Sequence, residues 1–408
     1  MINVIGLGYI GLPTALMFAA SGEEVIGTDI NSRVVEQLSK GEVTFEEEGL
    51  RDLFLKAVEN SIQFSTEYQR ADMYIVSVPT PYDKLTKKID PSYLVSAIDS
   101  ILDVCLSGSV IIIESTISPG TIERRIKPQI AGRGFLTGRD VHLVHAPERI
   151  LPGNMLQELV TNSRTIGAED YDIGLRVKNI YASFCKGEIV VTDIKSAEMS
   201  KVVENTFRDI NIAFANELAK ICHANDIDVY EIISLANRHP RVNILQPGPG
   251  VGGHCIPIDP WFLVGDNPDI VDLILAARRV NDNMPAYVFY RIKEIMAQEG
   301  IADYGRVGLY GLTYKENVDD TRESPTLQLL AHASQQGVDN FRVYDPWVKQ
   351  DLVEGQYHSF SDFVRDIDLM VLMVGHEDIK NNCNLLEGKI IYDTKRVLKN
   401  GLYTIVYL

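Results

Sequence analysis

The feature that most constrains the fold of this chain is a glycine-rich turn near its start, Gly6-x-Gly8-x-x-Gly11. A short apolar run at residues 2–6 leads into the turn, and a helical pattern at residues 12–20 leads out of it. Glycines at these positions allow a tight turn and let the backbone approach a pyrophosphate at the helix N-terminus. The turn therefore predicts the opening of a βαβ unit, which builds parallel sheets covered by helices.

A second apolar run supports this interpretation because it ends in an acid, Asp29, 18 residues after the last glycine of the turn. An acid at this place binds a ribose 2′-hydroxyl and repels a 2′-phosphate, and the next residues, Ile30 and Asn31, carry no positive charge. The unit thus predicts NAD rather than NADP as the cofactor. A glycine turn that binds no ligand is the alternative.

The remaining pattern predicts two βα regions with a helical region between them. Further strands of the first region are expected at residues 73–78, 110–114, 141–144 and 164–167, with helices at 91–105 and 171–183. Helices of the middle region are expected at 193–225, 228–236 and 269–299, the last interrupted before Pro285. Strands of the last region are expected at 306–310, 341–344, 368–374 and 390–392.

These elements predict an α/β protein in which a helical middle domain with a long central helix joins two Rossmann-like, doubly wound domains. The expected domains are residues 1–192, which bind NAD, 193–300, which carry the helices and the loop around Cys255, and 301–408, the second Rossmann-like domain.

Charge and cysteine content narrow the function classes. The chain has 39 Lys and Arg against 56 Asp and Glu, a net charge of −17, so neither nucleic acid nor a membrane is an expected partner. Five cysteines, an odd number at uneven spacing, favour a reducing compartment. The first residues lack the pattern of a signal peptide, so we expect a cytoplasmic protein without a membrane span.

The strongest single motif is a loop rich in glycine and proline at residues 248–260, which holds Cys255 and, four residues later, Asp259. Most cysteines pack as small buried hydrophobes, which we expect of Cys105, Cys185, Cys222 and Cys383. The polar, flexible surroundings of Cys255 suit a nucleophile instead, although core packing stays an open alternative. His254 and Cys255 lack the partners of a metal site, so no metal is expected.

The middle helix carries a second cluster. Lys201, Asn205 and Arg208 share one helix face in an otherwise apolar segment, and a buried cation and amide need partners. A solvated stripe is the alternative. Arg238, His239 and Arg241 add positive charge before the Cys255 loop, which in so acidic a chain indicates an anionic substrate.

Three polar segments follow predicted strands, where ligands bind in open α/β sheets. They are residues 78–81, which include Thr80, residues 115–116, which include Thr116, and residues 146–149, whose Glu148 is a candidate general base. A polar loop at residues 311–325 follows the first strand of the last domain and is a further candidate for ligand contact.

Together these motifs resemble the UDP-glucose/GDP-mannose dehydrogenase family, the nucleotide-sugar 6-dehydrogenases, and the resemblance runs in order through essentially the whole chain. It rests on GLGYIGLP, VPTP, ESTISPGT, APERILPG, the Lys201–Asn205 helix, GPGVGGHCIPIDPWF and GLTYKENVDDTRESP. The resemblance implies a four-electron oxidation of a sugar C6 alcohol to a carboxylate with two NAD⁺ per turnover. Within the family, residues 237–245 and APERILPG most resemble the members that act on a UDP-N-acetylhexosamine, and this resemblance implies the D-mannosamine epimer as the first candidate substrate.

The resemblance also assigns roles. It implies that Cys255 traps the aldehyde, that Lys201 is the acid/base group, that Asn205 holds the oxyanion, that Asp259 activates water and that Glu148 assists hydrolysis. It implies NAD contacts at Gly6, Gly8, Tyr9, Ile10, Gly11, Asp29, Thr80, Thr116 and Arg322. It implies sugar-nucleotide contacts at Arg149, Ile150, Lys201, Asn205, Arg208, His239, Arg241, Gly252, Tyr314, Lys315 and Arg396. One departure is Lys395 where the family pattern has arginine, which leaves open whether Lys395 or Arg396 reaches the diphosphate.

Other functions remain to be separated from this one. A sister enzyme would act on UDP-GlcNAc, UDP-GalNAc or UDP-glucose, a β-hydroxyacid dehydrogenase would remove only two electrons, and a nucleotide-sugar sensor would remove none. The yield of NADH per substrate, two, one or zero, distinguishes the four-electron enzyme from the last two classes.

A homodimer or higher homo-oligomer is expected because the middle region has apolar stretches, residues 270–277 and 287–295, that one chain does not fully cover. Arg241 would then reach the sugar nucleotide of the other chain. A monomer whose third domain covers these stretches is the alternative.

Overall fold

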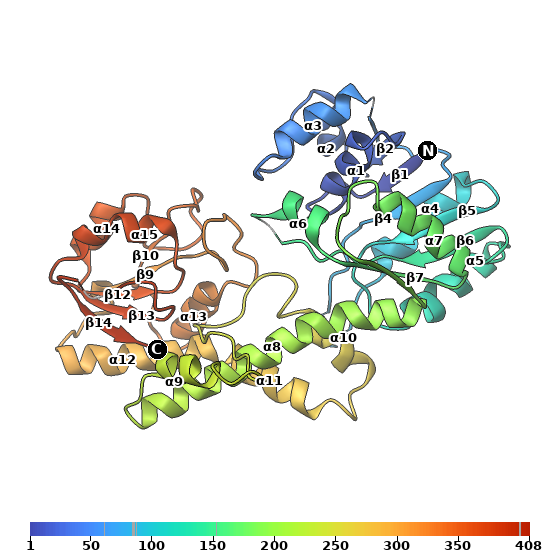
Figure 1. The fold of residues 1–408 in the computed structure, drawn as a ribbon. Coiled ribbons are helices and arrows are strands. Elements are labelled where there is room, and N and C mark those ends of the chain that lie inside the picture. Colours follow the sequence, from blue (N-terminus) through green and yellow to red (C-terminus); the bar gives the residue numbers. More distant parts are fainter. Residues whose placement is uncertain (61, 84–85, 87, 152, 400) are drawn as a thin grey trace. The chain divides into compact units, whose positions relative to one another are not determined.

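The computed structural model describes the whole chain except residues 61, 84–85, 87, 152 and 400. The chain divides into two compact units, Met1–Glu204 and Asn205–Leu408, and the long helix α8 (Ile194–Ala224) contains the boundary (Figure 1). Each unit has its own parallel sheet and its own cores. The α/β fold class predicted from the sequence is confirmed.

The sheet of the first unit has the strand order β3-β2-β1-β4-β5-β6-β7-β8 in the described part of the chain. The strands are β1 (Ile2–Ile5), β2 (Val25–Thr28), β3 (Gln63–Ser65), β4 (Met73–Val76), β5 (Ser109–Ile113), β6 (Val141–His145), β7 (Arg164–Ala168) and β8 (Ile189–Thr192). Neighbouring strands are parallel except β6 and β7, which pair antiparallel. The amino end of β7 therefore lies beside the carboxyl end of β6, where ligands bind.

Helices cover both faces of this sheet, because successive strand residues point to opposite sides. Ile75 packs with α1 and α7, whereas its neighbours Tyr74 and Val76 pack with α4 and α5. The helices of this unit are α1 (Gly11–Ala20), α2 (Ser32–Ser39), α3 (Leu50–Glu59), α4 (Ser92–Val104), the π-helix η1 (Ile122–Ile126), α5 (Lys127–Gly132), α6 (Met155–Thr161) and α7 (Tyr171–Tyr181).

The sheet of the second unit is parallel throughout and has the order β11-β10-β9-β12-β13-β14 among the described residues. Numbered within the unit, this is 3-2-1-4-5-6, the order of a dinucleotide-binding Rossmann sheet. The strands are β9 (Val307–Tyr310), β10 (Arg342–Tyr344), β11 (Gln356–Tyr357), β12 (Leu369–Leu372), β13 (Ile390–Asp393) and β14 (Thr404–Tyr407). Two of them, β11 and β14, were not predicted.

The helices of the second unit, after its share of α8, are α9 (Val229–Ala236), α10 (Asp259–Asp266), α11 (Asp272–Asp282), α12 (Met284–Glu299), α13 (Pro325–Ser334), α14 (Phe360–Asp366) and α15 (Glu377–Asn381), with 3-10 turns η2 (Tyr304–Arg306) and η3 (Cys383–Leu386). The predicted interruption before Pro285 is present, since α11 ends at Asp282 and Pro285 stands in the first turn of α12.

One expectation about the middle region is wrong. Most of the stretch 287–295 is covered, because Val288, Phe289, Ile292 and Ile295 are at most 1% exposed, and only Tyr290 among its large apolar side chains is exposed. They pack in the core of their own unit with residues such as Leu329 and Phe341. The other stretch does leave large apolar side chains open, since Ile270 and Leu273 are exposed.

No helix within the described residues is both long enough and apolar enough to cross a membrane.

Candidate active site

The glycine turn joins β1 to α1 with geometry that only glycine permits. Gly6 has a φ of +88°, and a Cβ on Gly11 would stand 1.8 Å from the carbonyl oxygen of Gly6. Gly8 differs, because a Cβ there would meet nothing within 4 Å. The open space beside Gly8 is where the chain offers room for a pyrophosphate at the N-terminus of α1.

Asp29 follows β2 at the carboxyl edge of the sheet. Its Oδ2 accepts a hydrogen bond from the Leu7 N–H at 2.8 Å, and its Oδ1 accepts one from the Asn31 N–H at 2.8 Å. A carboxylate has about four acceptor positions, so two remain for a ribose diol. The side chain after it, Ile30, is 77% exposed and uncharged. The residues present thus fit NAD.

The loops after β4 and β5 are fastened to each other at the same edge. The Ser115 hydroxyl donates to the Val78 carbonyl at 2.7 Å, and the Thr80 hydroxyl donates to the Thr116 carbonyl at 2.7 Å. The structure therefore brings Thr80 and Thr116 together on the rim predicted from the sequence. Tyr9, on the glycine turn, is exposed with its ring 4.5 Å from that of Phe45.

Glu148 follows β6 and is buried. One of its oxygens accepts the Arg149 N–H at 2.7 Å, and the other is ion-paired with Arg164. The Arg149 side chain pairs with Glu204 at 2.7 Å, and Ile150 is 6% exposed. Glu148 is thus a buried, ion-paired carboxylate at the carboxyl edge.

On α8 the structure separates the three residues predicted to share a face. Lys201 and Asn205 are buried on consecutive turns, whereas Arg208 is exposed. The Asn205 amide donates to the Asp259 carboxylate at 2.6 Å, with both side chains buried. The solvated-stripe alternative is therefore wrong for Lys201 and Asn205.

Cys255 stands one turn before α10, and its carbonyl accepts hydrogen bonds from the N–H groups of Ile258 and Asp259 at 3.0 and 2.9 Å. This turn ties Cys255 to the carboxylate that Asn205 contacts. Cys255 is half-buried and belongs to none of the apolar cores. The second unit therefore gathers a thiol, a carboxylate and an amide in one place.

The loop before Cys255 packs closely on the polar loop at residues 311–325. A Cβ on Gly252 would stand 2.6 Å from the Tyr314 Cβ, and one on Gly253 would stand 2.9 Å from the Tyr314 ring. The Gly253 N–H donates to the Arg322 carbonyl at 2.9 Å. Glycine at these positions therefore lets the loop of Cys255 and the loop of Tyr314, Lys315 and Arg322 meet.

Lys395 and Arg396 differ in their surroundings. The Arg396 guanidinium pairs with Asp228 at 2.8 Å and lies over the rings of Tyr230 and Tyr407. Burial lowers the pKa of the Lys395 ammonium group, and the Lys395 Nζ lies 3.4 Å from the position of a Cβ on Gly248. The Lys395 ammonium group therefore lies near the loop that precedes Cys255, whereas the Arg396 guanidinium is paired elsewhere.

Residues 237–245 form an exposed basic segment. His239 and Arg241 are exposed, and the segment is tied down by Asn237, whose amide bonds both the N–H and the carbonyl of Ile244. On α8, Asn211 likewise donates to the Asn243 carbonyl at 2.8 Å and accepts the Leu245 N–H at 3.0 Å. The segment is held by its amides while its cations stay open to solvent.

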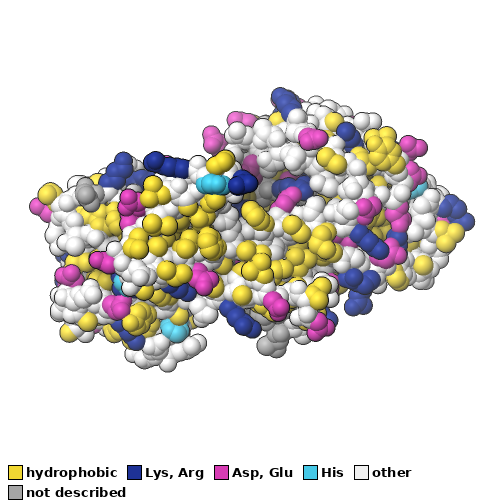
Figure 2. All heavy atoms as spheres, turned by 60° about the horizontal axis from the view of Figure 1, so that its bottom comes forward, with side chains coloured by type: hydrophobic (Ala, Val, Ile, Leu, Met, Phe, Trp, Pro, Cys, Tyr) yellow, Lys and Arg dark blue, Asp and Glu magenta, His cyan; other side chains and the backbone are white. Residues whose placement is uncertain are grey.

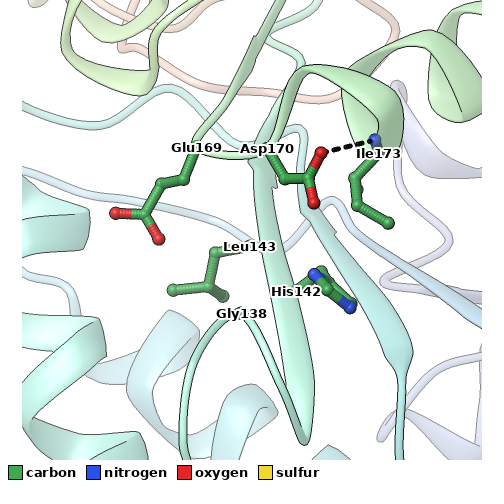
Figure 3. A pocket seen from close by; sticks show the side chains of 6 residues that line it. All are labelled: Gly138, His142, Leu143, Glu169, Asp170 and Ile173. Carbon is green, nitrogen blue, oxygen red and sulfur yellow. Dashed lines mark hydrogen bonds between the residues drawn. The ribbon is translucent and has the colours of Figure 1, made fainter.

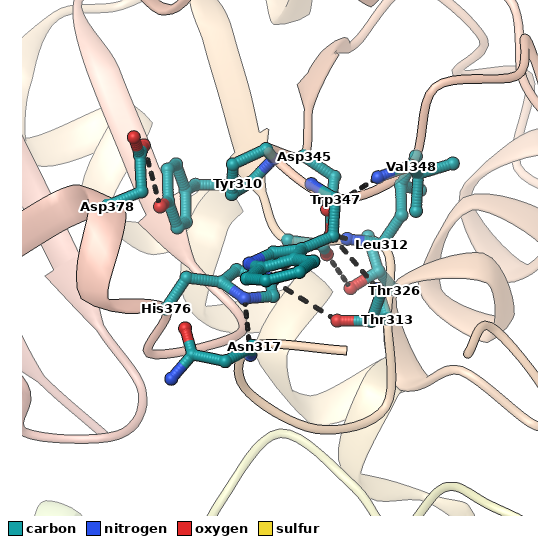
Figure 4. Close-up of polar contacts among 12 residues, drawn as sticks. Tyr310, Leu312, Thr313, Asn317, Thr326, Asp345, Trp347, Val348, His376 and Asp378 are labelled. Atoms are coloured by element: carbon teal, nitrogen blue, oxygen red, sulfur yellow. Dashed lines mark hydrogen bonds and ion pairs between the residues drawn. The ribbon is translucent and has the colours of Figure 1, made fainter. Parts of the chain in front are cut away.

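Asp345, after β10, occupies in the second sheet the place that Asp29 occupies in the first. Figure 4 shows its carboxylate among backbone donors, and it accepts the N–H groups of Leu312, Thr313, Trp347 and Val348. Buried His376 adds a fifth contact at 3.3 Å, and its Nδ1 accepts the Asn317 N–H at 2.9 Å. Burial alone would raise the pKa of Asp345, but the hydrogen bond from His376 and the backbone donors lower it. This saturated carboxylate has no capacity for a ribose, so the second sheet does not repeat the NAD site.

A small hollow elsewhere in the first unit is not part of this arrangement. It is lined by Gly138, His142, Leu143, Glu169, Asp170 and Ile173 (Figure 3). It lies at the amino end of β6, away from the carboxyl edge, and Asp170 is occupied as the N-cap of α7. Within the described residues, no group of three or more His, Cys, Asp or Glu side chains could hold a metal ion.

Sequence reasoning missed several residues that position the site. Buried Asn216 of α8 accepts the Gly248 N–H at 2.9 Å and donates to Asn281 at 2.9 Å, which anchors the start of the Cys255 loop. Arg164, Glu114 and His376 were also missed. A carboxylate closing the apolar run 110–114 was a usable signal for Glu114, whereas the others have partners far away in the sequence.

An NAD-type glycine turn, a buried carboxylate–amide pair one turn from the half-buried Cys255, and a second Rossmann sheet without a dinucleotide site indicate the class of NAD-dependent dehydrogenases. Three domains of the UDP-glucose/GDP-mannose dehydrogenase family match the chain: the NAD binding domain over residues 1–185, the central domain over 195–283 and the UDP binding domain over 308–400. The chain belongs to this family.

Individual relatives show which members of the family the chain is similar to. The chain is 43% identical to the UDP-N-acetyl-D-mannosamine dehydrogenase of Methanococcus aeolicus, over 98% of this chain and 92% of the relative. It is 39% identical to the NDP-N-acetyl-D-galactosaminuronic acid dehydrogenase of Ralstonia nicotianae, over 97% and 95%. Among solved structures, the UDP-N-acetyl-mannosamine dehydrogenase Cap5O from S. aureus is 42% identical, with a TM-score of 0.89, and covers 100% of this chain and 97% of its own.

Proposed function

We propose that this chain oxidises the C6 alcohol of UDP-N-acetyl-D-mannosamine to a carboxylate, with two NAD⁺ per turnover. The observation that carries the proposal is the buried contact of Asn205 with Asp259, one turn from Cys255. A thiol beside a carboxylate and an amide suits capture of an aldehyde, which a two-electron dehydrogenase does not need. Relatives named UDP-N-acetyl-D-mannosamine dehydrogenase, at 43% identity, support the choice of sugar.

The residues of this chain divide the chemistry as follows. When bound, NAD⁺ would supply the hydride acceptor for each of the two oxidations. Lys201 takes the proton of the C6 hydroxyl, and the Cys255 sulfur then adds to the C6 aldehyde while Asn205 holds the oxygen. After the second oxidation, water attacks the thioester, the carbon–sulfur bond breaks and the Cys255 thiolate leaves. Asp259 and Glu148 orient this water and take its proton.

Substrate binding is assigned to the cations and to the packed loops. In a chain of net charge −17, the diphosphate needs local positive charge, which Arg149, Arg208, His239, Arg241, Lys315 and Lys395 supply. Gly252 and Tyr314 form the place where the two loops meet, and Ile150 gives an apolar contact. We propose Lys395 in place of Arg396 as the diphosphate contact of this segment.

Three further parts of the interpretation are proposals of the same kind. The three-domain division at residues 192 and 300 is retained, and the odd number of cysteines supports a cytoplasmic enzyme. A homodimer is supported by an exposed apolar stripe on α8 at Met199, Val203, Phe207, Phe214 and Ile221. Figure 2 turns the side of α8 and α11 forward and shows hydrophobic side chains gathered on that surface.

The test is a panel of UDP-sugars assayed by NADH absorbance. UDP-N-acetyl-D-mannosamine is expected to give two NADH per sugar consumed and the highest kcat/KM. A yield of one would assign a simple two-electron dehydrogenase, and a yield of zero with retained binding would assign a sensor. A higher kcat/KM with the GlcNAc, GalNAc or glucose nucleotide would keep the mechanism and change the substrate.

A further inference from the structure

Glu148 belongs to a buried cluster of charges in the first unit that the mechanism above leaves unexplained. The cluster also contains Glu114, which follows β5, and Arg164, which opens β7. The side chains of Glu114, Glu148 and Arg164 are 0, 5 and 3% exposed. Buried charges are costly unless they are paired, so this arrangement requires a function or a compensating contact.

The antiparallel pairing of β6 and β7 explains why a cation reaches this edge. His145 pairs with Gly167, and the same register continued for three residues places Arg164 opposite Glu148. A parallel β7 would have put its first residue at the other edge of the sheet. The guanidinium also lies over the Tyr181 ring, 4.5 Å from its centroid, which fixes its plane.

Arg164 interacts more strongly with one of the two carboxylates than with the other. It is ion-paired with Glu148 through Nη2, whereas its Nη1 lies 3.6 Å from Glu114 and makes no hydrogen bond within the described structure. Glu114 is held instead by two hydroxyls, from Ser77 at 2.7 Å and from Tyr181 at 3.2 Å. One cation thus faces two acids, and one negative charge of the pair has no counterion.

The groups around Glu114 determine how readily this carboxyl holds a proton. Ser77 and Tyr181 are neutral donors, and burial lowers the pKa of nearby His145 to about 3, so that ring is uncharged. Burial, followed by the charge of Glu148, raises the pKa of Glu114 to about 7, although Arg164 opposes the rise. Glu114 therefore exchanges its proton within the working range of an enzyme, while Arg164 stays with Glu148.

We propose that Glu114 and Arg164 are positioning residues for Glu148, and that the proton on Glu114 sets how strongly Arg164 holds the Glu148 carboxylate during thioester hydrolysis. The inference rests on the proposed role of Glu148 in that step. When Glu114 is protonated, Arg164 interacts with Glu148 as its only charged partner. Arg164 then stabilises the ionised Glu148 carboxylate and makes it a weaker base toward water. With Glu114 ionised, the charge is shared and Glu148 accepts the proton more readily. Hydrolysis should therefore become faster as the pH rises through about 7.

Ser77 connects this cluster to the cofactor turn. A Cβ on Gly6 would stand 2.7 Å from the Ser77 carbonyl, and one on Gly11 would stand 3.1 Å from the Ser77 Cβ. The residue that donates to Glu114 is therefore packed beneath the glycine turn.

The test uses rapid mixing of the full-length enzyme with NAD⁺ and UDP-N-acetyl-D-mannosamine, with acyl-enzyme on Cys255 followed by intact mass and hydrolysis rates measured from pH 6 to 8. Glu114→Gln keeps the shape and can keep the contacts to Ser77 and Tyr181, but it carries no titrating proton. It is expected to remove the rise in hydrolysis near pH 7 and to hold the rate at the low-pH level, a change of up to about tenfold at pH 8. Glu169→Gln, at the opposite edge of the sheet, is the matched control and should keep the wild-type profile.

Glu148→Gln separates failure of this proposal from failure of the proposed function. It should accumulate acyl-enzyme at every pH, and absence of accumulation would overturn the role of Glu148 itself. If Glu148→Gln accumulates acyl-enzyme but Glu114→Gln keeps the wild-type rise near pH 7, the positioning proposal alone is wrong. Arg164 is buried between charged groups, so the hydrolysis rate of Arg164→Lys is interpreted only together with its melting temperature. The pH profile of Glu114→Gln is the decisive test of the positioning proposal.

Discussion

At the scale of single residues, Cys255 differs from the other four cysteines by what surrounds it. Cys185 and Cys222 are buried in the apolar cores, and Cys105 and Cys383 pack against them partly buried. Burial also raises the pKa of Cys105, which keeps that thiol protonated and unreactive. Cys255 alone stands in a polar turn, bonded through its carbonyl to the start of α10.

Replacing Cys255 by serine is expected to abolish overall turnover, by about 10³-fold or more, because the hydroxyl is a weaker nucleophile and a poorer leaving group. NADH yield and intact mass after mixing with substrate measure the effect, and an ester or an aldehyde-level intermediate should accumulate. Cys105→Ser is the matched control and should retain activity. A near-normal NADH yield from Cys255→Ser would rule out the covalent mechanism.

Lys395 and Arg396 give a second prediction at this scale. Lys395→Ala should raise the KM for the UDP-sugar by about tenfold or more with an unchanged melting temperature, because it removes one charge-assisted contact to a phosphate. Arg396→Ala should lower the melting temperature instead, because Arg396 joins Asp228 to two aromatic rings. The reverse pattern, with KM raised by Arg396→Ala alone, would return the diphosphate contact to Arg396.

At the scale of elements, the sequence predicts those helices, turns and breaks that depend on residues close together in the chain. The glycine turn, the long helix α8 and the break at Pro285 could be predicted because periodicity, glycine and proline act within a few residues. The short strands β11 and β14 escaped because their pairing with β10 and β13 is decided by the sheet, not by their own residues. The strand β7 was predicted, but its antiparallel direction was not, because its pairing with β6 is likewise decided by the sheet.

The candidate site shows the same division. Cys255, Asp259, Lys201 and Asn205 were found from their spacing and residue type. Arg164, Asn216 and His376 were not, because each acts on a residue more than ten positions away in sequence. Helix periodicity predicted that Lys201, Asn205 and Arg208 share one face, but the structure buries only Lys201 and Asn205 and leaves Arg208 exposed, because packing decides burial.

The turn between β1 and α1 yields a prediction at this scale. Gly8→Ala should leave the melting temperature unchanged, since a methyl group there meets no protein atom, but it should raise the KM for NAD⁺ because it fills the approach of the pyrophosphate. Gly132→Ala, where a Cβ also meets nothing, is the matched control and should change neither quantity. Loss of stability in Gly8→Ala with an unchanged KM would contradict the assignment of the turn.

At the scale of the whole molecule, the exposed apolar stripe on α8 is the feature that supports the proposed dimer. Its five exposed side chains recur every four or seven residues and so lie on one helix face. A closed dimer would bury the stripe against its own copy, because two-fold symmetry repeats one patch. The alternative is a monomer whose third domain covers the apolar stretches, and the stretch in α12 is indeed packed against residues of that domain such as Leu329 and Phe341.

Assembly and site sharing are tested together by mixing two inactive variants, Arg241→Ala and Cys255→Ala. Sedimentation should show dimers of each variant. If Arg241 serves the site of the other chain, each mixed dimer carries one site with both residues intact, and activity returns to a fraction of the wild-type value. Absence of activity despite demonstrated subunit exchange would assign Arg241 to its own chain, and a monomer in sedimentation would dismiss the dimer.

The saturated carboxylate of Asp345 has a consequence for how natural variants of such a chain are interpreted. Asp29 and Asp345 each follow the second strand of their sheet, and the two sheets share the order 3-2-1-4-5-6 over their first six strands, yet Asp29 keeps open acceptor positions and Asp345 does not. An aspartate-to-asparagine change should therefore weaken NAD⁺ binding when it falls at Asp29 and lower the melting temperature when it falls at Asp345. The same residue change, at matching places in two related sheets, is therefore expected to weaken cofactor affinity in one half of the chain and to lower stability in the other.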